Sequence, residues 1–206
     1  RLRSCFEAAV ARLARHCAID GRLDAARLDG AQLVSFDLAW TNADLLAADA
    51  ELLFTSGDYQ GAVNALASLT AQQDAEGQYT YATHLKLAIA LARSGQKALA
   101  DREIAGLAHR VAGNSAKLNN ICWELALANV ALDRALAACD AALAVQANDA
   151  AVLDSRGFVQ FRRGDYAAAI ASYDKALAIR PKMPESLYGR GLARQKKGDT
   201  AGANAD

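Results

Sequence analysis

The feature that most constrains the fold is a segment that recurs along the chain about every 34 residues. In its clearest copy, "RRGDYAAAIASYDKALAIRP" spans residues 162–181, and its Gly-Asp turn returns at 57–58 and at 198–199. One copy lacks the turn glycine and has Val130 in its place. An alanine follows the turn position by five residues in the successive copies: Ala26, Ala62, Ala100, Ala135, Ala169 and Ala203. A fixed period of this length indicates a repeat array, in which each copy is one supersecondary unit.

Each copy is predicted to be a helical hairpin. The first helix has roughly 13 residues and ends at the turn glycine, which adopts the left-handed backbone of a helix stop. An aspartate that follows the glycine, Asp165 or Asp199, is expected to cap the second helix. Pro181 ends the second helix of its copy, because proline cannot continue a helix. Small residues such as Ala169 then lie where the two helices cross.

The composition favours an all-α chain. Apolar residues make up 53% of the sequence but aromatic residues only 6%, and alanine, the best helix former, dominates. No run alternates β-branched with polar residues as a half-buried strand does. The sequence therefore predicts an all-α fold, an α–α superhelix (solenoid) of about six antiparallel helical hairpins.

The repeat also sets expected boundaries. We expect residues 1–42 to form a divergent N-terminal hairpin and residues 43–115 to form two looser units. The remainder, 116–206, divides into units that align without gaps: 116–149, 150–183 and the incomplete 184–206. Because the chain has no initiator methionine and stops inside a unit, we expect it to be a fragment of a larger protein.

Charge and hydropathy exclude two classes of partner. Lysine plus arginine and aspartate plus glutamate balance at 23 each, whereas a surface that binds the phosphate backbone needs clustered positive charge. No stretch of ~18 apolar residues is present, so no segment is expected to insert into a membrane. We expect neither nucleic-acid binding nor membrane insertion.

The sequence contains no pattern typical of an enzyme. The three histidines fall in three different predicted helices, and the adjacent His16 and Cys17 point in directions about 100° apart on a helix. No glycine-rich phosphate loop and no His-Glu-x-x-His motif occurs. The four cysteines lack the close paired spacing of zinc sites. We expect no catalytic residue, no metal ligand and no cofactor.

Two cysteines fall where they can meet. Cys122 and Cys139 lie in the first and second predicted helices of one unit, at positions that should face each other. A disulfide is open to them in an oxidising compartment. Two buried thiols in contact are the favoured interpretation, because a buried free cysteine behaves as a small apolar residue.

The repeat resembles the tetratricopeptide (TPR) family. The resemblance covers 43–206, and its most specific motif lies in 150–183, where "LDSRG" precedes "GDYAAAIASYDKALAIRP". Arg156 stands where the family has a large apolar residue, Phe161 stands one place after the usual aromatic, and Trp123 occupies a place that is small elsewhere. A pentatricopeptide RNA-binding repeat has a similar length but fits less well, because the Gly-Asp-Tyr turn and the terminal proline belong to the TPR pattern.

The resemblance implies a non-enzymatic scaffold that binds a peptide or protein segment in a concave groove lined by the first helix of each hairpin. Residues at the matching groove positions are Asn120, Glu124, Asp154, Phe158, Phe161, Arg162, Glu185, Tyr188 and Gln195. Phe158 and Tyr188 are the preferred anchors, because aromatic side chains contribute strongly to interfaces. The lysine and arginine residues with which chaperone-tail binders clamp a terminal carboxylate are missing here.

Two alternatives remain open. The segments "NNICWELA" and "LDSRGFVQFRRGDY" resemble the C-terminal TPR tails of larger bacterial proteins, some of which have a transglutaminase-like domain. The chain would then dock or orient such an enzyme. Alternatively, it self-associates as a homo-oligomer through an open C-terminal end, since the ends of repeat arrays are normally capped. The cytoplasm is the favoured compartment, with the periplasm as the alternative if the parent protein is exported.

Overall fold

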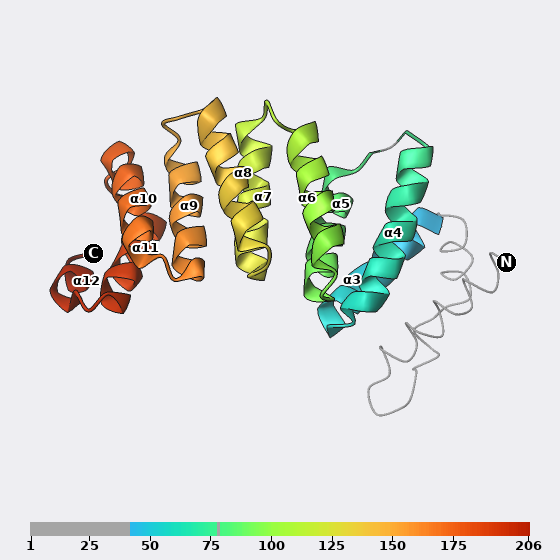
Figure 1. The fold of residues 1–206 in the computed structure, drawn as a ribbon, viewed down its shortest axis with the longest axis horizontal. Helices are drawn as coiled ribbons and strands as arrows, with labels where there is room; N and C mark the ends of the chain where they lie inside the picture. Colours follow the sequence, from blue (N-terminus) through green and yellow to red (C-terminus); the bar gives the residue numbers. More distant parts are fainter. Residues whose placement is uncertain (1–41, 78) are drawn as a thin grey trace, which may run out of the picture. The chain divides into compact units, whose positions relative to one another are not determined.

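The computed structural model describes residues 42–77 and 79–206, which contain ten helices and no strand. The helices, labelled as in Figure 1, are α3 (Asn42–Ser56), α4 (Tyr59–Ala75), α5 (Tyr81–Arg93), α6 (Lys97–Arg110), α7 (Ser115–Ala128), α8 (Leu132–Val145), α9 (Ala150–Arg163), α10 (Tyr166–Ile179), α11 (Pro184–Lys196) and α12 (Thr200–Ala205). The all-α prediction is confirmed over this part of the chain. The hairpin expected at 1–42 lies outside the described residues, apart from residue 42.

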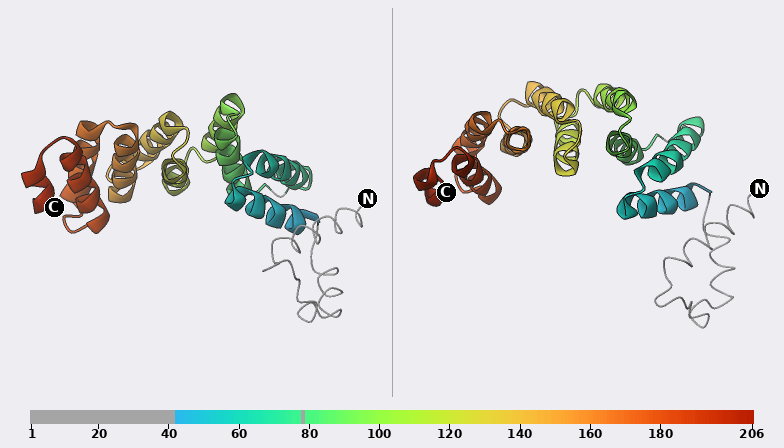
Figure 2. Two further views of the ribbon diagram at one scale, coloured as in Figure 1. Left: turned by 90° about the horizontal axis from the view of Figure 1, so that it is seen from below. Right: turned by 60° about the horizontal axis from the view of Figure 1, so that its bottom comes forward.

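Consecutive helices pack side by side as hairpins. Packing is most extensive for α3 with α4, α7 with α8 and α9 with α10. Helix α11 also packs on α12, and each hairpin from α7 onward packs on the next. Figures 1 and 2 give views from different directions, and in both the two helices of each pair run antiparallel. The predicted array of helical hairpins is therefore confirmed for the described residues.

Left-handed glycines join the two helices of most hairpins. Gly57, Gly95, Gly164 and Gly198 have φ angles of +83° to +85°, which residues with a Cβ rarely adopt. In each case the second helix begins two residues after the glycine. The turns at Gly57, Gly164 and Gly198 are the predicted Gly-Asp turns, whereas Gly95 is followed by a glutamine.

The aspartate caps are only partly as predicted. The Oδ1 atoms of Asp58 and Asp199 each accept a hydrogen bond at 2.9 Å from a backbone N–H of the following helix. The Asp165 side chain makes no such bond. Its Oδ2 instead accepts a bond at 2.9 Å from Arg163 Nε, so here the expected cap was wrong: an ion pair across the turn takes the carboxylate away from the helix end.

The chain forms two compact units, each with its own core. The first, described from residue 42, ends at Ala90, and the second is Leu91–Asp206, so the boundary falls within α5. In the second unit the alanines at the helix crossings are completely buried: Ala135, Ala142, Ala169 and Ala176. Their small side chains let the two helices of each hairpin approach closely, as the sequence predicts. None of the described helices is both long and apolar enough to cross a bilayer.

Candidate functional site

The turn between α7 and α8 differs from the other turns within hairpins. Asn129, with φ 54°, takes the left-handed position, and Ala131 adds a second positive φ of 46°. Helix α8 begins three residues after Asn129 rather than two. The assignment of Val130 to the glycine position was therefore wrong. Asparagine tolerates the left-handed region better than valine, which is β-branched.

This extra residue shifts the register of α7 by one position. Trp123 lies six residues before Asn129, as Phe158 lies six residues before Gly164. Counted in this way, Trp123 and Phe158 are equivalent positions on successive first helices. Their ring centroids lie 5.3 Å apart, with the ring planes tilted by 42°. Both side chains are half-buried, so each keeps part of its surface open to solvent.

An arginine extends this aromatic pair. Arg162 lies one helical turn after Phe158 on α9, and its guanidinium carbon is 5.7 Å from the centre of the Phe158 ring. Arg162 is exposed, and within the described part of the chain its guanidinium makes no ion pair. We call Trp123, Phe158 and Arg162 the aromatic surface. It presents two rings and one cation from α7 and α9.

The nine predicted groove residues differ in exposure. Asn120, Glu124, Phe158 and Phe161 are half-buried, Asp154 is buried, and Arg162, Glu185, Tyr188 and Gln195 are exposed. Phe161 packs toward α10, where its ring lies 5.6 Å from that of Tyr166. Sequence reasoning missed Trp123 as a surface residue. The available indication was the asparagine of the "NVALD" turn, which permits a left-handed residue one place before Val130.

Asp154 makes an internal contact between hairpins. Its side chain accepts a hydrogen bond at 2.6 Å from Ser186 Oγ, which joins α9 to α11. The residue is only 8% exposed. Burial raises the pKa of the Asp154 carboxyl, the Ser186 bond partly offsets this, and the charge of Glu185 raises the pKa further. Asp154 therefore holds successive hairpins together.

Tyr188 lies on a separate part of the molecule. It is 70% exposed on α11 and lines a hollow of about 360 Å³ together with Leu187, Leu192 and Gln195. Residues of α12 form the other side of this hollow. Tyr188 thus contributes to a surface formed by α11 and α12.

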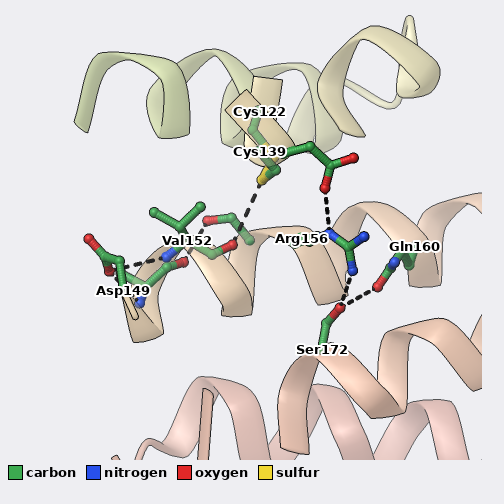
Figure 3. The surroundings of a disulfide bond; sticks show 10 residues. Cys122, Cys139, Asp149, Val152, Arg156, Gln160 and Ser172 are labelled. Carbon is green, nitrogen blue, oxygen red and sulfur yellow. Dashed lines mark hydrogen bonds and ion pairs between the residues drawn. A yellow bond between two sulfur atoms is a disulfide. The ribbon is translucent and has the colours of Figure 1, made fainter. Parts of the chain in front are cut away.

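Arg156, which departs from the usual apolar residue, bridges three helices. Its Nε donates to Asp140 on α8 at 2.7 Å, and its Nη1 donates to Ser172 on α10 at 2.9 Å (Figure 3). The Ser172 hydroxyl also lies 2.6 Å from the side-chain amide of Gln160. One unit later, Arg190 Nη1 donates to Asp174 at 2.7 Å across α10 and α11. Arginine at this place therefore serves as a link between hairpins.

A disulfide joins Cys122 of α7 to Cys139 of α8. The Cα atoms are 5.4 Å apart, a separation that a disulfide spans, and both residues are completely buried. The expectation of two free thiols was wrong, because the crossing of α7 and α8 brings the two side chains into bonding geometry. Figure 3 shows Cys139 Sγ facing the Val152 carbonyl oxygen of α9, at 3.8 Å. Elsewhere in the described part, no cluster of metal-binding side chains occurs.

Comparison with known proteins agrees with this architecture. The TPR repeat family matches residues 159–198. Residues 159–198 carry a tetratricopeptide repeat. The predicted TPR resemblance is thereby confirmed. A search of curated proteins finds no match to the chain.

Solved structures also align with the chain. A tetratricopeptide repeat protein from Parabacteroides merdae aligns with a TM-score of 0.52 and 18% identity, over 79% of this chain and 63% of that one. The MamA protein aligns with a TM-score of 0.47 and 22% identity, over 79% of this chain and 86% of that one. At such identity the likeness to the Parabacteroides protein is a likeness of fold. The TPR fold is typically a non-catalytic scaffold for protein interactions.

Proposed function

We propose that this chain is a non-enzymatic scaffold that binds a segment of another protein along the first helices of its hairpins. The observation that carries the proposal is the aromatic surface, where the tilted rings of Trp123 on α7 and Phe158 on α9 contact one another. Arg162 adds an exposed cation at the same place. Tryptophan and arginine are enriched among the residues that dominate binding energies.

The geometry suits an extended segment. Two half-buried rings on the first helices of successive hairpins offer apolar contact area at little conformational cost, since neighbouring side chains already restrict them. The guanidinium of Arg162 presents hydrogen-bond donors beside the rings. A bound segment could therefore bury an apolar side chain on the rings while a carbonyl or carboxylate accepts from Arg162.

The test begins with a phage-displayed library of random peptides selected on the full chain. An enriched peptide is synthesised, and its affinity is measured by calorimetry. Phe158→Ala is expected to weaken binding at least about tenfold, which corresponds to ~1.4 kcal/mol. The matched control is Ile179→Ala, which removes an apolar side chain that is 44% exposed on α10. Equal losses in both variants, or no enrichment over an empty support, would contradict the proposal.

A second function, self-association, is favoured by the hollow between α11 and α12. Tyr188 is largely exposed there, beside the half-buried Leu187 and Leu192. Such a surface can accept an apolar element from a second copy. Light scattering over a range of concentrations tests this function: the mass should rise with concentration, and Tyr188→Lys should prevent the rise. A monomeric mass at every concentration would exclude it.

A further inference from the structure

The disulfide lies at a helix crossing where the next hairpin has a glycine packed against a tyrosine. In the register set by Asn129, Cys122 is equivalent to Gly157, since each lies seven residues before the left-handed residue of its turn. Gly157 packs against the ring of Tyr173, and a Cβ at Gly157 would lie 2.7 Å from that ring. Cys122 meets Cys139 at the same crossing of α7 and α8. A covalent bond therefore replaces glycine–tyrosine packing in this hairpin.

The same hairpin has the least favourable turn. Ala131 is a residue with a Cβ at φ 46°, a conformation that has an energetic cost because the Cβ crowds the following carbonyl oxygen. The turn contains no glycine to relieve this cost. Because the turn itself is unfavourable, other contacts must fix the position of α7 relative to α8. The disulfide is the strongest of these.

Trp123 is the neighbour of Cys122 in the chain. Its ring rests on Phe158 of α9, while Cys139 Sγ faces the Val152 carbonyl of the same helix. The bond thus includes the residue that precedes Trp123 on α7 and contacts α9, the helix that carries Phe158. A rotation or slide of α7 would move Trp123 away from Phe158.

We propose that the Cys122–Cys139 disulfide is a positioning element that holds Trp123 against Phe158, so that partner binding depends on the oxidation of this pair. The inference rests on the proposed function. Closing the bond removes two protons and two electrons from the two thiols, and an external disulfide takes them up by thiol–disulfide exchange as it is reduced to two thiols. Because both cysteines are fully buried, reductants reach the bond poorly once the chain has folded. The redox state at the time of folding then determines whether the surface is complete.

The experiment observes Trp123 directly. The chain has two tryptophans, so Trp40→Phe leaves Trp123 as the sole indole. Full chains are refolded from denaturant with or without reductant, and non-reducing mass spectrometry identifies the oxidised form by its loss of about 2 Da. In the reduced form we expect Trp123 emission to shift to longer wavelength and acrylamide quenching to increase. Far-UV circular dichroism should keep its helical signal in both forms.

A variant separates the bond from the volume that it fills. Cys122→Ala with Cys139→Val restores most of the apolar volume without a covalent link. We expect its Trp123 emission to match that of the reduced parent. Emission that matches the oxidised parent would show that packing alone positions Trp123, and would overturn the proposal. Loss of the helical signal in both bond-free forms would overturn it too, because the bond would then be needed for folding as such.

The other two cysteines provide the control. Cys5→Ser with Cys17→Ser keeps only the pair under test, and its response to reductant should equal that of the parent. A response lost in this variant would assign the effect to Cys5 and Cys17 and overturn the proposal.

The peptide selected above supplies the second readout. Its affinity should fall about tenfold in the reduced chain and in the Cys122→Ala, Cys139→Val variant. Unchanged affinity would overturn the dependence of binding on oxidation. Failure of the two proposals is distinguishable: if no peptide is selected, the proposed function fails while the Trp123 emission still tests the positioning role. Emission that is indifferent to the bond overturns the positioning role whatever the chain binds.

Discussion

At the scale of single residues, Gly157 shows how closely the helices approach. A Cβ at this position would lie 2.7 Å from the Tyr173 ring, which is itself buried. Gly157→Ala should therefore overpack the crossing and lower the free energy of unfolding by about 1–3 kcal/mol. Gly106 in α6 has no atom within 4 Å of its Cβ position, so Gly106→Ala should raise that free energy by about 0.5–1 kcal/mol. Urea denaturation measures both, and changes of the same sign would contradict this account.

Asp154 gives a prediction about pH. Burial raises the pKa of its carboxyl in the folded chain, so the folded state binds this proton more tightly than the unfolded state. Its ionisation therefore lowers stability above the folded-state pKa, and that loss is recovered as the pH falls through this pKa toward the ordinary value of aspartate. Asp154→Asn removes the charge and keeps an oxygen that can accept from Ser186.

The variant should therefore have a higher melting temperature than the parent near pH 7, and the difference should shrink on acidification. Melting both proteins over a pH series measures this difference and cancels the pH dependence of the other groups. A difference that stays constant or grows on acidification would show that Asp154 carries no raised pKa.

At the scale of elements, the crossing of α9 and α10 depends on a small residue. Ala169 is completely buried there, whereas Ala167 on the same helix is exposed. Ala169→Leu should lower stability by about 1–3 kcal/mol, because the added atoms force the two helices apart. Ala167→Leu, which adds the same atoms at an exposed site, should change it little. Thermal unfolding compares the two, and equal effects would mean that the repeat register is misassigned.

The α7–α8 turn gives a second test at this scale. Ala131 adopts φ 46°, which glycine reaches without steric cost. Ala131→Gly should stabilise the chain by up to about 1 kcal/mol, since relief of strain outweighs the extra freedom of the unfolded chain. The control is Ala137→Gly at an exposed position within α8, which should destabilise the chain by a similar amount. Urea denaturation compares the two variants, and destabilisation by both would argue against the left-handed conformation of Ala131.

The sequence predicts those features of the helices that depend on interactions within a single repeat unit. The turn glycines and the alanine spacing predicted helix type and hairpin pairing, because both depend on backbone freedom and side-chain size within one unit. The register of α7 was not predicted, since Asn129 and Val130 are both compatible with a turn until the backbone is seen. If Val130 takes the turn position, Glu124 is equivalent to Phe158; because Asn129 takes it, Trp123 is the equivalent residue.

The contacts between hairpins could not be predicted from the sequence either. Arg156 looked like a departure from an apolar position, and only the positions of Asp140 and Ser172 explain it. Asp154 looked like a groove residue, and its burial depends on Ser186 thirty-two residues away. Such contacts depend on how one hairpin lies on the next, which a repeat pattern does not specify.

At the scale of the whole molecule, the proposed function depends on a surface that two hairpins form together. The aromatic surface is assembled from α7 and α9 within the second compact unit, and neither helix carries it alone. Its chemistry is two half-buried rings with a cation beside them, which fits a protein segment better than a small substrate. Binding should therefore change the emission of Trp123 and should require Phe158.

The most direct measurement is a titration of the Trp40→Phe chain with the selected peptide, followed by the emission of Trp123. The account predicts a saturable change in emission whose midpoint agrees with the calorimetric affinity, and loss of both signals in Phe158→Glu. Calorimetric binding that leaves Trp123 emission unchanged would place the peptide elsewhere on the chain and contradict the account.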